Sequence, residues 1–97
     1  MKRTSQDIEG FLQVIDVGIA CAQQIAKDTN EAWITECMEL AMKNFKVLQA
    51  RVVDSTLQGS GGVSGLGISR AIDEWDVPRK LYDAGYDIEE YYRTYWK

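Results

Sequence analysis

The sequence predicts an all-α protein in which a long antiparallel helical hairpin is followed by a glycine-rich connector and two or three short C-terminal helices. Three observations support this fold class. Apolar residues recur at spacings of three and four up to residue 57, glycine is concentrated in residues 58–68, and capping residues punctuate residues 69–97. With 97 residues and 45% hydrophobic content, the chain is expected to form a single domain over residues 1–97.

The first predicted helix covers residues 5–27. Thr4 or Ser5 is expected to accept the capping hydrogen bond at its start. Gly18 lies on the apolar face, where it either lets a neighbouring helix approach closely or is simply tolerated at a cost of about 1 kcal/mol relative to alanine. The apolar face consists of Ile8, Phe11, Leu12, Ile15, Ile19, Ala22 and Ile25.

The second predicted helix covers residues 30–57, with Thr29 or Asn30 as its N-cap. Its apolar positions alternate at spacings of four and three, which is typical of a heptad seam. The loop between the two helices is short, so the helices are expected to fold back on each other as an antiparallel hairpin. The seam consists of Ile34, Met38, Ala41, Phe45, Leu48 and Val52.

Each hairpin helix also has a second apolar stripe beside its main face. Trp33, Leu40 and Val47 follow one another at heptad spacing on the second helix; on the first helix the flank is Val14, Val17 and Cys21. A lone hairpin cannot bury both its seam and these flanks. Helices of this length measure roughly 35–42 Å, which is long for a compact domain of this size. We therefore expect the C-terminal segment and a second copy of the chain to cover the hairpin, which makes the protein a homodimer.

The connector contains five glycines between Gly59 and Gly67 and is expected to be a linker or hinge. No lysine follows its glycines and no strand precedes it, so it lacks the context of a phosphate-binding loop. A short helix is predicted over Ser69–Trp75, with Ser69 as its cap. A second is expected to start at Asp76 and end at Gly85 as a glycine C-cap, and a third is expected to follow it to the C-terminus.

The segment Leu81–Tyr91 carries the pattern L-x-x-A-G-Y-x-x-x-E. This pattern resembles the turn between short helices in ubiquitin-associated domains and in helix-hairpin-helix DNA-binding modules. The resemblance to the DNA-binding modules implies contact with DNA. Four acidic residues crowd the predicted turn and oppose contact with phosphate: Asp83, Asp87, Glu89 and Glu90. The alternative is a purely structural junction between two helices.

Glu36 and Glu39 form an E-x-x-E pattern that is similar to the magnesium-binding motif of all-α nucleotide pyrophosphohydrolases of the MazG type. In this resemblance the second half of the motif would be Arg51 to Asp54, and the arginine stands where a carboxylate is needed. A solvated helix face explains the two glutamates better. We assign no metal, no cofactor and no catalytic residue, and a small magnesium-dependent hydrolase remains an alternative. The absence of histidine excludes His-dependent nucleophilic catalysis and His-ligated metals.

Cys21 and Cys37 lie eight positions on either side of Thr29. They are expected to be reduced, buried thiols, with a disulfide or a reactive thiol as alternatives. No export signal or membrane span is predicted, so we expect a cytoplasmic protein, or one in the host cytoplasm if it is viral. The net charge of −4 divides as −2 in residues 1–57 and −2 in residues 58–97. This distribution argues against direct binding of nucleic acid.

The chain is therefore expected to be a non-catalytic adaptor, assembly or regulatory factor that binds a protein partner. The alternative is an inhibitor encoded by a phage or mobile element, which blocks a host protein that handles nucleic acid. Aromatic residues are dense near the C-terminus and lie beside acidic residues, which suits an interface with a basic partner. The predicted interaction residues are Trp33, Leu40, Val47, Tyr91, Tyr92, Tyr95, Trp96, Glu89 and Glu90.

Overall fold

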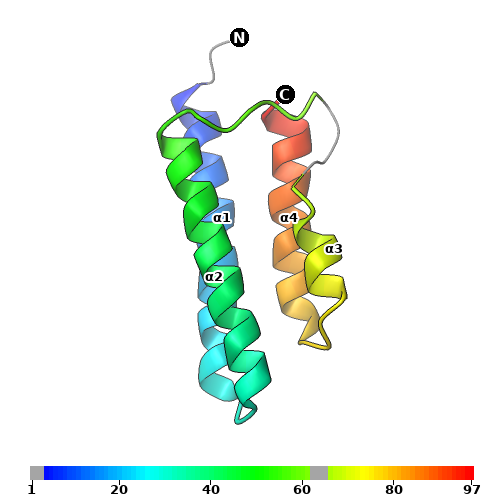
Figure 1. The fold of residues 1–97 in the computed structure, drawn as a ribbon. Helices are drawn as coiled ribbons and strands as arrows, with labels where there is room; N and C mark the ends of the chain where they lie inside the picture. Colours follow the sequence, from blue (N-terminus) through cyan, green and yellow to red (C-terminus); the bar gives the residue numbers. More distant parts are fainter. Residues whose placement is uncertain (1–3, 62–65) are drawn as a thin grey trace.

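The computed structural model describes residues 4–61 and 66–97, and within these ranges the chain is helical with no strand. The elements are α1 (Ser5–Asp28), α2 (Ala32–Val53), α3 (Ile68–Asp73) and α4 (Arg79–Tyr95). The predicted all-α fold and the antiparallel hairpin are confirmed, since α1 and α2 run side by side in opposite directions (Figure 1). The molecule is elongated, with extents of 46 × 21 × 17 Å.

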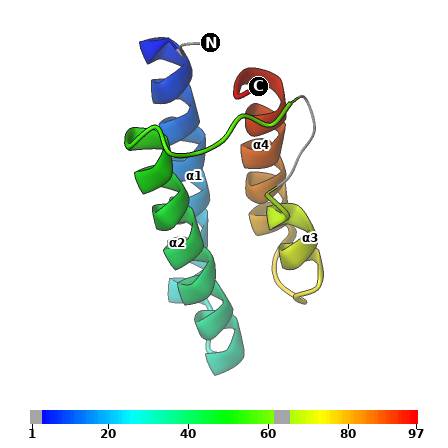
Figure 2. The same ribbon diagram turned by 45° about the horizontal axis from the view of Figure 1, so that its top comes forward.

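Helix α1 holds the fold together because it packs against both α2 and α4. The short helix α3 packs against α4 rather than against the hairpin (Figure 2). The C-terminal segment therefore covers one side of the hairpin, as the sequence predicts, and it does so through α1. Along most of its length, the outer side of α2 is not covered by another helix of the described ranges.

The buried residues of the hairpin are those of the two predicted apolar faces. Ile8, Leu12 and Ile34, near the ends of these faces, are only partly buried. Such regular three-four spacing places each set on one side of its helix, so the two faces meet along their length. The buried set comprises Phe11, Ile15, Ile19, Ala22 and Ile25 from α1, and Met38, Ala41, Phe45, Leu48 and Val52 from α2.

Gly18 marks the point where three helices converge. A Cβ atom added there would lie 3.0 Å from Cδ1 of Ile88 on α4 and 3.2 Å from Cε2 of Phe45 on α2. Both distances are shorter than ordinary van der Waals contact. Of the two sequence-based alternatives for Gly18, close approach of a neighbouring helix is therefore the correct one.

The hairpin helices begin and end close to the predicted positions. Thr4 caps α1, because its Oγ1 accepts a hydrogen bond of 3.1 Å from the backbone N–H of Asp7. Thr29 Oγ1 accepts instead from the N–H of Glu31, so α2 begins at Ala32, two residues later than predicted. It ends at Val53 rather than at residue 57, because Ser55 adopts a left-handed conformation with a φ of 58°.

The prediction that Gly85 ends a helix is wrong. Gly85 is buried inside α4, a single helix that starts after Pro78 and continues to Tyr95. A glycine inside a helix costs about 1 kcal/mol relative to alanine, and burial of a continuous apolar face outweighs this cost. The resemblance of Leu81–Tyr91 to a turn between short helices fails for the same reason, since these residues are helical throughout. The buried face of α4 consists of Leu81, Ala84, Gly85, Ile88 and Tyr92.

Residues 58–61, 66 and 67 of the predicted connector lie outside the helices, whereas its last residue, Ile68, is the first residue of α3. Residues 62–65 lie outside the described ranges. Gly67 has a φ of 68°, a left-handed conformation that favours glycine, and it immediately precedes α3. Helix α3 therefore begins at Ile68, one residue before the predicted cap at Ser69, and ends at Asp73 rather than at Trp75.

We predict that Phe45→Ala destabilises the fold by about 3–5 kcal/mol, because it empties the site where α1, α2 and α4 meet. Lys46→Ala, at an exposed neighbouring position, is expected to change stability by no more than about 0.5 kcal/mol. Urea unfolding followed by circular dichroism measures both variants. Equal midpoints for Phe45→Ala and the wild type would show that the seam is not the core.

Candidate functional site

The outer side of α2 carries an exposed apolar stripe, which consists of Trp33, Leu40 and Val47. Their exposed fractions are 43%, 49% and 54%. Because the three residues follow one another at heptad spacing, they lie in line along one side of the helix. The buried seam of the same helix faces α1, so α2 presents apolar side chains both inward and outward.

A shallow groove of about 510 Å³ adjoins the stripe at Val47. Its walls come entirely from α2, so it is a furrow on one helix and not a cavity between elements. Met42 and Ala50 give it apolar walls, and the remaining lining residues are Glu39, Lys43 and Lys46. The outer side of α2 is thus apolar along the stripe and charged along its edge.

The charges on α2 are divided between its two halves. The acidic residues Glu36 and Glu39, together with Glu31 at the N-cap, precede Leu40, whereas the basic residues Lys43, Lys46 and Arg51 follow it. All six side chains are exposed. Glu36 and Glu39 of the E-x-x-E pattern therefore lie on a solvated face. In the described part of the chain, no three His, Cys, Asp or Glu side chains gather into a group that could hold a metal ion.

The C-terminal aromatic residues do not form one surface. Tyr92 is 7% exposed and Trp96 is 1% exposed, so both belong to the core of this chain. Their polar atoms bind the chain where the connector begins: the Tyr92 hydroxyl donates to the carbonyl of Gln58 at 2.8 Å, and Nε1 of Trp96 donates to the carbonyl of Leu57, just before the connector, at 3.2 Å. These two side chains fasten the end of α4 to the segment that follows α2.

Tyr91 packs against the start of α1. Its ring centroid lies 5.3 Å from that of Phe11, and its hydroxyl donates a hydrogen bond of 2.9 Å to the carbonyl of Asp7. Burial raises the pKa of the Tyr91 hydroxyl, and the charges of Asp7 and Tyr95 raise it further, so the group stays protonated as a donor. Gly10 leaves room for this contact, because a Cβ atom there would overlap the hydroxyl.

Three members of the predicted acidic-aromatic surface are exposed or half-buried on α4: Tyr95, Glu89 and Glu90. Tyr95 is 55% exposed and rests on Tyr91, with ring centroids 4.6 Å apart. Glu90 pairs with Arg93 on the same helix, and Glu89 is half-buried. Sequence periodicity could not assign these roles, because Phe11 and the carbonyls of the connector, which hold the tail, lie far away in the sequence.

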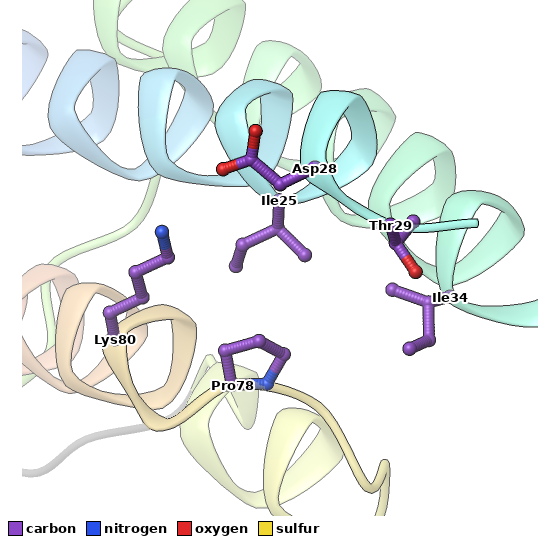
Figure 3. A pocket seen from close by; sticks show the side chains of 6 residues that line it. All are labelled: Ile25, Asp28, Thr29, Ile34, Pro78 and Lys80. Atoms are coloured by element: carbon purple, nitrogen blue, oxygen red, sulfur yellow. The ribbon is translucent and has the colours of Figure 1, made fainter. Parts of the chain in front are cut away.

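A small hollow lies between the end of α1, the start of α2 and the start of α4 (Figure 3). Its volume of about 210 Å³ is below the roughly 300–1,000 Å³ that is usual for ligand pockets. The Asp28 carboxylate at its edge accepts hydrogen bonds of 3.1 and 3.0 Å from Gln24, so the hollow is mainly an apolar gap between helix ends. Its lining consists of Ile25, Asp28, Thr29, Ile34, Pro78 and Lys80.

Both cysteines are free, as the sequence predicts, but they are half-buried rather than buried. Burial raises the pKa of the Cys21 thiol, and the positive charge of Lys80 opposes this rise without reversing it. The thiol is therefore protonated at neutral pH, which disfavours a nucleophilic role.

Comparisons of the chain with protein-family models, with curated proteins and with solved structures found no match. None of the helices in residues 4–61 and 66–97 has the length and apolar character needed to cross a bilayer. On the surface of the described residues, three of the exposed large apolar side chains, Trp33, Leu40 and Val47, lie in line on α2.

We predict that Trp96→Ala destabilises the fold by about 3–5 kcal/mol, because it removes a buried ring that packs edge-on against Phe11. Tyr95→Ala serves as the matched control and is expected to cost about 1 kcal/mol or less, since it removes an exposed ring contact. Thermal unfolding of the two variants tests this difference. Equal losses of stability would contradict the distinct placement of these neighbouring aromatics.

Proposed function

We propose that this chain is a non-catalytic interaction protein that binds a protein partner through the outer side of α2. The observation that supports this proposal is the exposed stripe of Trp33, Leu40 and Val47. Exposed apolar residues scattered singly are normal on soluble proteins, whereas apolar residues gathered on one side of an element are more typical of an interaction surface.

The composition of the stripe favours contact with a protein. Trp33 offers a large flat ring, and its Nε1 donates to the carboxylate of Glu31, which satisfies its polar atom at the surface. Tryptophan is enriched among the residues that dominate binding energy in protein interfaces. Charged residues at the edge of the stripe would form the polar rim that such interfaces commonly have.

We place this activity in a reducing compartment, the cytoplasm of the cell or of the host. Cys21 and Cys37 support this placement, because they are free thiols on the two helices of the hairpin. Structural disulfides are typical of oxidising compartments, and free half-buried thiols are typical of reducing ones.

We predict that Leu40→Glu abolishes partner binding while the chain stays folded, because it places a charge in the middle of an apolar contact. Val17→Glu is the matched control, since Val17 is 57% exposed but lies on α1. Both variants and the wild type are immobilised and used to capture proteins from the native host extract, with circular dichroism as the check on folding.

The proposal requires that at least one protein is retained by the wild type and by Val17→Glu and is lost with Leu40→Glu. Self-association that depends on Leu40 also meets this requirement, because a second copy is a protein partner. If Leu40→Glu is folded and retains every protein that the wild type retains, the outer side of α2 is not the binding surface.

A further inference from the structure

We infer that the partner on the outer side of α2 is a second copy of the same chain, bound with the two α2 helices antiparallel. This inference rests on the proposed function, because it names the partner of the same surface. It is supported by two features of α2, which are the arrangement of its charges and the arrangement of its exposed apolar residues.

The apolar stripe is compatible with a two-fold axis at its centre. If Leu40 packs against Leu40 of the second copy, antiparallel pairing places Trp33 opposite Val47 of the other chain, and the reverse. The largest side chain of the stripe then faces the smallest, so that the volumes of the two layers match. A heptad-spaced stripe stays on the contact line along two supercoiled helices.

The charges select the antiparallel direction. Glu36 and Lys43 occupy equivalent positions one heptad apart, on the same edge of the stripe. In the antiparallel pair each Glu36 lies beside Lys43 of the second copy, which gives two such ion pairs related by symmetry. In a parallel pair the two-fold axis would put the Glu36 and Lys43 side chains of the two copies on opposite edges of the contact, so these ion pairs could not form.

These two side chains are available for that contact. Both are exposed, and across residues 4–61 and 66–97 the structure gives neither of them an ion-pair partner within the chain. More broadly, the acidic first half of α2 would meet the basic second half of the other α2. The contact is thus self-complementary, as a two-fold symmetric interface requires.

The interface is expected to be weak. A contact along one helix is smaller than the roughly 800 Å² per partner that stable complexes usually bury, so we expect a dissociation constant on the order of tens of micromolar. Ion pairs at the rim of such an interface decide its orientation more than its strength.

Sedimentation equilibrium from about 1 to about 500 µM, a range that brackets this expected constant, tests the inference. The wild type is expected to form a dimer. Glu36→Lys and Lys43→Glu are each expected to raise its dissociation constant about tenfold or more, because each puts two like-charged pairs into the antiparallel contact. Glu9→Lys, the same change at an exposed position on α1, is the matched control and is expected to dimerise like the wild type.

A double variant and a mixture of the two single variants complete the test. The double variant Glu36→Lys, Lys43→Glu restores opposite charges in the antiparallel pair, so it is expected to regain dimerisation. An equimolar mixture of the two single variants is expected to form heterodimers, while each variant alone is largely monomeric. In a parallel pair residues 36 and 43 of the two copies would lie on opposite edges of the contact, so the single reversals would leave the dissociation constant unchanged.

A wild type that stays monomeric over the whole range overturns the inference, and so do single reversals that leave the dimer unchanged. Circular dichroism verifies that each variant is folded. The proposed function fails separately: if the wild type is monomeric but retains a host protein that Leu40→Glu loses, the surface is an interface and a second copy is not its partner. If neither contact occurs, both proposals are wrong.

Discussion

The close contact of three helices at Gly18 is the constraint on which the rest of the structure depends. Phe45 from α2 and Ile88 from α4 both reach the backbone of α1 at this glycine, so the hairpin and the C-terminal helix share one core. Because α1 serves as the common support, α4 is held on α1 rather than on α2. The outer side of α2 therefore stays open, and its apolar stripe remains at the surface.

A second set of contacts keeps α4 in this position at its far end. Chain ends are usually poorly ordered unless something holds them. Here the hydroxyl of buried Tyr92 donates a hydrogen bond to the carbonyl of Gln58, and the indole N–H of buried Trp96 donates one to the carbonyl of Leu57. These bonds join the end of α4 to the chain where the connector begins. Tyr91 adds a bond to the first turns of α1. The aromatic density of the C-terminus is thus largely a matter of packing within the chain.

Local periodicity was sufficient to predict the hairpin, because each helix repeats its apolar residues on one face over many turns. It predicted the buried seam of α2 and the exposed stripe beside it as separate faces. It failed at Gly85, where a local signal for a helix end competes with the apolar face on both sides of it, and tertiary packing prevails. It also could not separate buried Tyr92 and Trp96 from exposed Tyr95, because their burial depends on Phe11 and the connector.

The charge pattern of α2 has an explanation within the helix itself, and that explanation is incomplete. Acidic residues near a helix start and basic residues near its end complement the helix dipole, but this effect fades beyond the first and last turn. The sign changes between Glu39 and Lys43, close to the middle of α2, where the dipole has little influence. Those two residues can support each other at a spacing of four, whereas Glu36 has no basic residue three or four positions away in the sequence. In the antiparallel dimer that we propose, the second copy would supply the missing partner for Glu36 and would cover the apolar stripe at the same time. That one arrangement would account for two features that the packing of a single chain leaves unexplained.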